Sequence, residues 1–185
     1  MSQSISDYYT QTIGTLDGQV AEFHAEFRQY LQCKQGCAGC CKTNVEFRIS
    51  YIEAVALQQA LIALPAAQQA RIRENLASGK PDCPLLVNER CSVYASRPAL
   101  CRAYGTIIQM GETVATCELN FNGVDADIPL KKLDLLPYYN VLDDLSALVY
   151  KPESPENNNF PPKHSIRDFL TLFSGEKADV SMAKD

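Results

Sequence analysis

Eight of the 185 residues are cysteines, and all of them lie between Cys33 and Cys117. Four fall within nine residues, separated in turn by three residues, two residues and none. Backbone turns at this spacing can direct several thiolates toward one point, as a tetrahedral metal ion or an iron–sulfur cluster requires. The pattern therefore indicates a chelating site. Its candidate ligands are Cys33, Cys37, Cys40, Cys41, Cys83, Cys91, Cys101 and Cys117.

Soft thiolate ligands select zinc, iron–sulfur clusters or copper(I) over magnesium or calcium. We expect zinc, or else iron or an iron–sulfur cluster, as the cofactor. Two four-sulfur zinc sites would use all eight cysteines, whereas one cluster would use four. The neighbours Cys40 and Cys41 could serve different sites, or only one of them could be a ligand. Cys117 follows Cys101 after fifteen intervening residues, so a buried structural thiol is the alternative there.

The composition is that of a globular domain rather than a small disulfide-stapled scaffold. Hydrophobic residues make up 46% of the chain and charged residues 21%, and a chain of this size buries roughly 70% of its unfolded surface. The first residues lack the basic start and apolar stretch of a secretory signal. We therefore expect a reducing cytoplasm, where clustered cysteines are typical of metal or redox sites.

Hydropathy and charge argue against two classes of partner. No apolar run approaches the roughly 20 residues that cross a bilayer, so we expect no membrane contact. The net charge of −5 does not favour nucleic acid, which is bound by Lys and Arg through counterion release. Metal ions are the expected partners, and the C-terminal segment could dock an unidentified protein. Basic residues close to cysteines are expected to offset thiolate charge; they are Lys34, Lys42, Arg48, Arg90, Arg97 and Arg102.

Apolar residues that recur every three or four positions predict a mainly α fold. Short strands or irregular loops would carry the cysteines. A first helix is expected at 15–32. Ser50 and Glu53 form a capping box for a second helix. Pro65 suits the first turn of a third helix, which ends near Gly79.

The C-terminal part is expected to contain two more helices. One runs from Pro129 to Tyr150 and is broken or kinked at Pro137. Ser165 and Asp168 begin the other, which reaches about Phe173. Short strands are expected at 45–49 and 104–110. We predict a small single metal-binding domain at 1–150, a Pro- and Asn-rich connector at 151–164, and a short helix with a frayed tail at 165–185.

The chain resembles the YkgJ-like cysteine-cluster proteins, to which zinc or iron chelation is attributed. The resemblance covers residues 33–117 and implies metal binding without an established reaction. Four motifs carry it: Cys37-Ala38-Gly39-Cys40-Cys41; Cys83-Pro84-Leu85-Leu86; Cys91-Ser92-Val93-Tyr94 with Arg97-Pro98; and Cys101-Arg102-Ala103-Tyr104.

Two other functions stay open beside metal chelation. The pattern is also similar to that of a flagellin lysine N-methylase, which implies an iron–sulfur enzyme for electron or methyl transfer. Free thiols would instead suit a redox sensor. The C-x3-C-x2-C spacing of radical S-adenosylmethionine enzymes is present, but their barrel is larger than this chain. An all-cysteine ligand set leaves no open position for hydrolysis, so it favours a structural or storage role over an enzyme.

Outside the cysteines, the sequence offers few candidates for chemistry. His24 flanks the apolar stripe of the first helix and is expected to be structural, and His164 is expected to be exposed in the connector. Arg97 and Arg102 are expected to compensate charge or pair with a carboxylate. Tyr94 and Tyr104 are expected to be packing residues.

Overall fold

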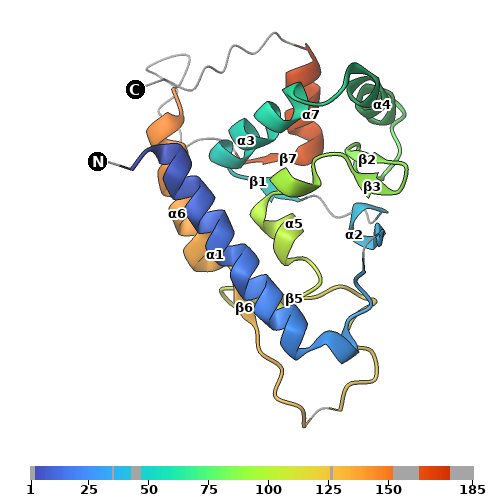
Figure 1. Cartoon of the computed structure of the whole chain (residues 1–185), viewed down its shortest axis with the longest axis vertical. Helices are drawn as coiled ribbons and strands as arrows, with labels where there is room; N and C mark the ends of the chain where they lie inside the picture. The colour runs from blue at the N-terminus through green and yellow to red at the C-terminus, as the bar shows by residue number, and fades with distance from the viewer. Residues whose placement is uncertain (1–2, 35, 43–46, 126, 152–162, 176–185) are drawn as a thin grey trace.

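The fold is mainly α-helical, as the sequence predicts. The computed structural model describes residues 3–34, 36–42, 47–125, 127–151 and 163–175. In that part of the chain it contains seven α-helices and a few short strands (Figure 1). The α-helices are α1 (Ile5–Glu26), α2 (Gly39–Lys42), α3 (Tyr51–Ile62), α4 (Ala66–Ala77), α5 (Ala99–Ala103), α6 (Leu136–Val149) and α7 (Ile166–Gly175).

Helix α1 begins ten residues earlier than the predicted helix at 15–32 and ends six residues earlier. A capping box explains the early start, because the Ser4 hydroxyl accepts from the Asp7 amide and the Asp7 carboxylate accepts from the Ser4 amide. Beyond α1, the predicted helix becomes a short 3-10 helix, η1 (Arg28–Tyr30). The predicted apolar stripe is buried: Ile13, Leu16, Val20, Phe23 and Phe27.

The capping box predicted for α3 is confirmed, with Ser50 as N-cap and Glu53 at the third helical position. Helix α4 follows Pro65 as predicted, and it ends before Gly79, whose φ is +65°. The prediction at Pro137 is wrong. This proline lies in the first turn of α6, where its missing amide costs no helical hydrogen bond, so it starts the helix rather than kinking it.

The strands form three small sheets. β1 (Arg48–Ile49) pairs antiparallel with β7 (His164–Ser165), and β2 (Leu86–Val87) pairs antiparallel with β3 (Arg90–Cys91). β4 (Ile108–Met110) lies between antiparallel β5 (Thr113–Ala115) and parallel β6 (Leu133–Asp134).

The predicted strands are therefore shorter than expected, at Arg48–Ile49 and Ile108–Met110; residues 43–46 lie outside the described residues. His164 is half-buried and paired with Ile49 in the sheet, not exposed in a connector. Most of the predicted connector, 152–162, and the tail after residue 175 also lie outside the described residues.

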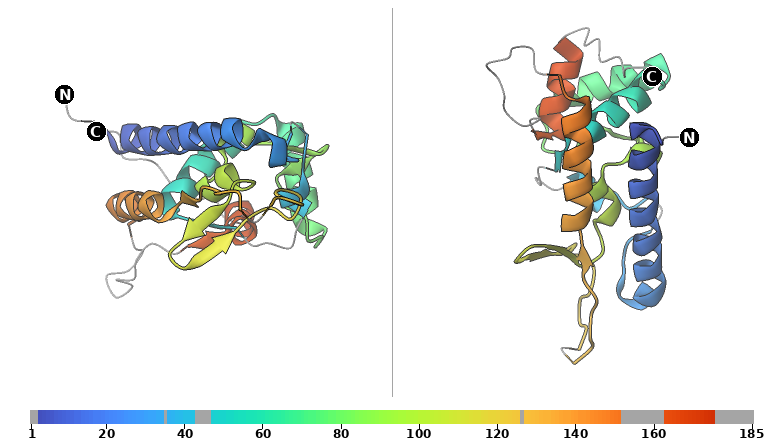
Figure 2. Two further views of the ribbon diagram at one scale, coloured as in Figure 1. Left: turned by 90° about the horizontal axis from the view of Figure 1, so that it is seen from below. Right: turned by 90° about the vertical axis from the view of Figure 1, so that its left-hand side faces the viewer.

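Two apolar clusters share helices α3 and α5. The first joins α1, α3, α5 and α6 around Leu16, Leu135 and Leu142. The second joins α3, α4 and α7 around Leu57, Ile72 and Leu170. Helices α1 and α6 lie side by side along one edge, with α7 and α4 at the other end of the molecule (Figures 1 and 2). No helix among the described residues is long and apolar enough to cross a membrane.

Glu53 joins α3 to α5 through a buried carboxylate that is only 1% exposed. One oxygen accepts from the Ser50 amide and hydroxyl, both at 2.8 Å, and the other accepts from the Ala99 amide at 2.7 Å. Burial raises the pKa of this carboxyl above its usual range, and the three donors oppose the shift. Because Ala99 opens the helix that carries Cys101, Glu53 fixes the position of a candidate ligand.

Replacing this carboxylate should destabilise the fold. We expect Glu53→Gln to lower the free energy of unfolding by about 2 kcal/mol, because an amide has one acceptor oxygen and leaves a buried N–H unpaired. Urea unfolding at equal metal content measures it. Glu74→Gln is the control, since the Glu74 carboxylate is exposed and pairs only with Arg71. Equal, small losses in both variants would contradict the role given to Glu53.

Candidate metal centre

The eight cysteines come from five places in the fold, and none of them is disulfide-bonded. Cys33 and Cys37 lie in the loop after η1, and Cys40 and Cys41 lie in α2. Cys83 precedes the β2–β3 hairpin and Cys91 ends it. Cys101 lies in α5, and Cys117 follows β5.

Main-chain hydrogen bonds bring Cys41, Cys83 and Cys91 together. The Cys83 amide donates to the Cys41 carbonyl at 2.7 Å, and Cys91 lies opposite Leu86 in the hairpin. The hairpin turns through Asn88 and Glu89 with φ values of +52° and +60°, the signature of a tight two-residue turn. A 2.5 Å ion pair between Lys42 and Glu89 also links α2 to this turn.

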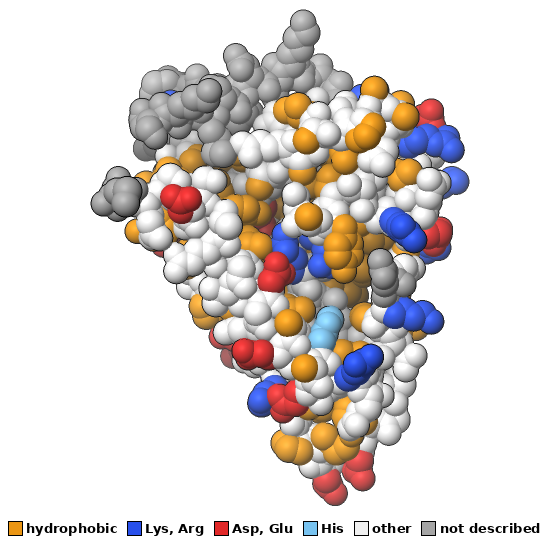
Figure 3. Space-filling view, viewed as in Figure 1, with side chains coloured by type: hydrophobic (Ala, Val, Ile, Leu, Met, Phe, Trp, Pro, Cys, Tyr) orange, Lys and Arg blue, Asp and Glu red, His pale blue; other side chains and the backbone are white. Residues whose placement is uncertain are grey.

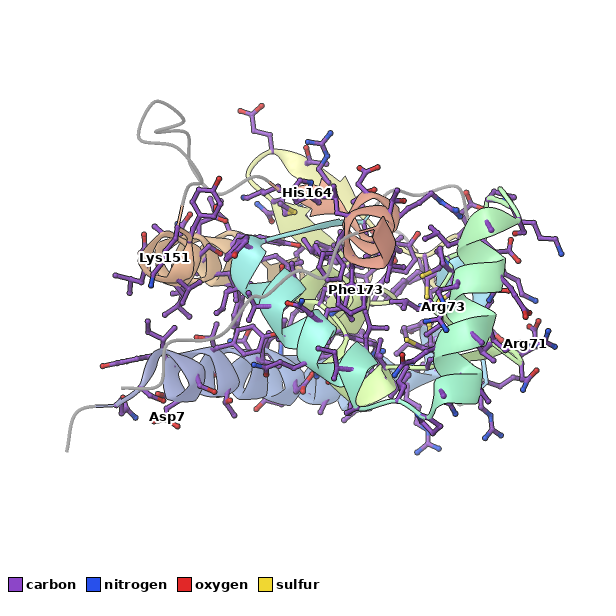
Figure 4. All side chains as sticks on the ribbon, turned by 90° about the horizontal axis from the view of Figure 1, so that it is seen from above. Asp7, Arg71, Arg73, Lys151, His164 and Phe173 are labelled. Atoms are coloured by element: carbon purple, nitrogen blue, oxygen red, sulfur yellow. The ribbon has the colours of Figure 1, made fainter. Side chains whose placement is uncertain are left out.

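Cys101 joins the same neighbourhood from α5. Cys40, Cys83, Cys91 and Cys101 all pack against the second apolar cluster, and sulfur atoms gather beside α4 and α7 in Figure 4. We define the second thiol group as Cys41, Cys83, Cys91 and Cys101.

Three other cysteines meet around residues 117–120, and we define Cys33, Cys37 and Cys117 as the first thiol group. The Asn120 side-chain amide donates to the Cys33 sulfur at 3.3 Å, and the Asn120 main-chain amide donates to the Cys117 carbonyl at 3.0 Å. A Cβ placed on Gly39 would lie 3.8 Å from the Cys37 sulfur and 3.4 Å from Leu119, so Cys37 faces the same loop.

Cys40 lies between the two groups. Its sulfur is 4.0 Å from that of Cys41. The pKa of Cys33 is raised mainly by burial, and thiolates at Cys117, Cys37 and Cys40 would raise it further. A thiolate at Cys40 would also raise the pKa of Cys41, Cys83 and Cys101 in the second group. Cys40 is therefore within electrostatic reach of both groups.

Burial and mutual repulsion keep most of these thiols protonated. Burial raises the pKa of Cys83 to about 11, and it raises the pKa of Cys101 further above the usual range. Cys40 is the exception, since the hydrogen bond from Cys41 and the nearby charge of Arg97 lower its pKa to about 6, while the pKa of Cys41 rises. A bound cation would remove the repulsion and displace the protons.

The donor set fits zinc or iron in its chemistry. Within the described ranges, no three Cys, His, Asp or Glu side chains already stand in a coordinating arrangement. Thiolate sulfur is nevertheless a ligand type that both zinc and iron bind in proteins.

Arg97 and Arg102 were predicted to compensate charge or to pair with a carboxylate, and each does one of the two. Arg102 pairs with Asp17 at 2.6 Å. Arg97 helps to lower the pKa of Cys40 and opposes the rise that burial causes in the pKa of Cys91. Its guanidinium lies 3.7 Å from the ring centre of Tyr94. Lys and Arg side chains also gather along the edge formed by α4 and the β2–β3 hairpin (Figure 3).

Four further predictions concern packing. Tyr104 packs edge-on against Phe47, as expected. Tyr94 is 63% exposed rather than packed into the core, and its ring contacts the Arg97 guanidinium. His24 is half-buried in α1, and its Nε2 has no hydrogen-bond partner in the described part of the chain. Cys117 is buried, with 8% exposure.

Two residues of the site have no distinctive motif in the sequence. Asn120 belongs to a loop without periodicity, and only its contacts reveal its role. Gly105 has a φ of +113°, and a Cβ there would lie 2.9 Å from the Cys33 sulfur. The glycine thus allows this sulfur to lie against the main chain. Its place directly after the Cys101–Tyr104 motif was the only available signal.

This mainly helical fold gathers eight cysteines, none of them disulfide-bonded, from loops, helices and a strand into two neighbouring groups, which is the arrangement of a cysteine-cluster domain. Residues 32–118 match the CxxCxxCC family model, described as "Putative zinc- or iron-chelating domain". The predicted resemblance to a cysteine-cluster chelating family is therefore confirmed over this segment. No curated protein and no solved structure matches the chain.

Adding a methyl group at Gly105 should disturb the first thiol group. We expect Gly105→Ala to expose Cys33 to alkylation at least about tenfold faster, since the methyl displaces the sulfur and a φ of +113° strains any other residue. Mass spectrometry of modified peptides measures the rate. Gly111→Ala is the control, because its φ is also positive, +59°, but nothing lies within 4 Å. An unchanged Cys33 rate would show that the site tolerates the methyl group.

Proposed function

We propose that this protein chelates zinc or iron through two centres of four cysteine thiolates each. The observation that supports the proposal best is the gathering of all eight cysteines, none of them disulfide-bonded, into two neighbouring groups within a family described by zinc or iron chelation. Such thiolates select soft or borderline metals.

The assignment follows from counting and proximity. Cys40 and Cys41 both lie near Cys83 and Cys91, so proximity to the second group does not separate them. A thiolate at Cys40 also raises the pKa of Cys33, whose group otherwise has three thiols. Cys40, which is within reach of both, completes the first centre. The proposed ligands are thus Cys33, Cys37, Cys40 and Cys117 for the first centre and Cys41, Cys83, Cys91 and Cys101 for the second.

A metal ion bound here would neutralise thiolate charge and tie distant segments together. The first centre would join Cys40 to Cys117, which lies 77 positions further along the chain. The second would join Cys41 to Cys101, which lies 60 positions further along. Metal-binding energy would therefore also be folding energy. The positive charge of Arg97 would offset part of the remaining negative charge of the thiolates at Cys40 and Cys91. We expect this to occur in a reducing cytoplasm.

A thiol redox sensor is the second candidate, and one observation favours it. Cys40 has a lowered pKa of about 6 and its sulfur lies 4.0 Å from that of Cys41. Thiolate character promotes oxidation. Peroxide would be reduced to water as two thiols lose their protons and form a disulfide. An iron–sulfur enzyme for electron or methyl transfer is the remaining alternative.

Metal analysis of anaerobically purified protein tests the proposal. We expect about two zinc or iron ions per chain, because two centres of four thiolates use all eight cysteines. Cys91→Ser and Cys117→Ser should each lose one ion, and Cys40→Ser should lose the same ion as Cys117→Ser. Val114→Ser, an exposed change on β5, is the control. Acid-labile sulfide equal to the iron would favour the iron–sulfur alternative, and reversible disulfides without bound metal would favour the sensor.

Removing the metal should destabilise the chain. We expect a chelator to lower Tm by about 10 °C, since each kcal/mol shifts Tm by roughly 2–4 °C at this size. Differential scanning calorimetry measures the change. Zinc should restore Tm and magnesium should not, because magnesium prefers oxygen ligands. An unchanged Tm after complete metal removal would refute a folding role for the metal.

A further inference from the structure

Asn120 lies at the point where three segments of the first thiol group meet. It is 3% exposed and follows Cys117 in a turn. Its side-chain oxygen accepts from the Gln32 amide at 2.8 Å, and its side-chain nitrogen donates to the Gly105 carbonyl at 2.6 Å. One side chain thus joins the main chain beside Cys33, the main chain after Tyr104 and the loop of Cys117.

These two main-chain contacts fix which way the amide points. An N–H requires an acceptor and a carbonyl requires a donor, so the Asn120 oxygen faces Gln32 and its nitrogen faces Gly105. The nitrogen has a second N–H, and this one donates to the Cys33 sulfur at 3.3 Å. The side-chain oxygen lies farther from that sulfur, at 3.8 Å.

The contact suits a sulfur that has lost its proton. A thiol could donate to the Asn120 oxygen, but a thiolate can only accept, and the amide N–H is already aimed at it. Hydrogen bonds to an ionised acceptor are stronger than those between neutral groups. The same side chain therefore accommodates the free thiol and favours the ligating form.

We propose that Asn120 is a positioning residue of the first metal centre, holding the Cys33 sulfur in its ligating orientation through an N–H···S hydrogen bond. The inference rests on the proposed function, in which Cys33 is a ligand. Asn120 lies outside the family match at residues 32–118. Partners that orient metal ligands typically change metal affinity by about 10- to 100-fold when they are replaced.

Asn120→Asp tests the inference with a side chain of the same shape. It places an oxygen against the Gly105 carbonyl and the Cys33 sulfur in place of the donor. The probe is zinc, loaded into the full chain and then competed with a chromophoric chelator. We expect one of the two zinc ions to bind about 10- to 100-fold more weakly. The other should bind as in the wild type.

A second readout separates positioning from general stability. In the zinc-loaded variant, Cys33 should be alkylated faster while Cys101 stays protected. Asn122→Asp is the matched control, because Asn122 is exposed and its amide donates only to the Glu118 carbonyl. If Asn120→Asp does not fold, Asn120→Ala removes the donor without adding charge, and the same two readouts apply.

The possible results are distinct. Selective weakening of one ion together with exposure of Cys33 supports the inference. A lower Tm of the metal-free chain with unchanged zinc affinity and unchanged Cys33 protection overturns it, because Asn120 would then only stabilise the loop. A wild-type chain that binds no zinc or iron overturns the proposed function itself.

Discussion

The buried carboxylate of Glu53 is the interaction on which the arrangement depends. It caps its own helix α3 and accepts from the first amide of α5, so it ties together the two helices that both apolar clusters share. The Ser146 hydroxyl on α6 accepts from the Ile52 amide nearby at 3.0 Å. These hydrogen bonds hold α5, and with it Cys101, in place against α3. The remaining segments then bring the other cysteines close to Cys101.

Without a bound cation, the thiols are unfavourable neighbours for one another in their ionised form. They are partly buried, close together and repel one another once ionised, so the pKa of Cys83 and of Cys101 rises. Short contacts hold the loops in place: the Cys83–Cys41 main-chain bond, the hairpin before Cys91, and the Asn120 amide beside Cys33. Metal binding would turn this repulsion into attraction.

Helix boundaries were predictable from the sequence where a local signal sets them. Ser50 and Glu53 cap α3, and Ser165 and Asp168 begin α7 as expected, since their hydrogen bonds span only three residues. The start of α1 was missed because Ser4 precedes the apolar pattern.

The site was predictable in its ligand types but not in its geometry. Clustered cysteines indicate metal chelation in any fold. Their division into two groups depends on contacts between residues far apart in the sequence. The Asn120–Cys33 bond spans 87 residues, and the Glu53–Ala99 bond spans 46. No short-range pattern encodes such contacts. Tyr94 was misjudged for the same reason, since its exposure depends on where η2 (Tyr94–Ser96) meets the surface.

X-ray absorption spectroscopy of the metal-loaded chain tests the central claim most directly. If two centres of four thiolates bind the metal, zinc should show four sulfur neighbours at about 2.3 Å and no nitrogen or oxygen in the first shell. Cys117→Ser, which should lose the ion of the first centre, gives the comparison spectrum, and its remaining zinc should keep four sulfur neighbours. A wild-type first shell of nitrogen and oxygen atoms would contradict the account.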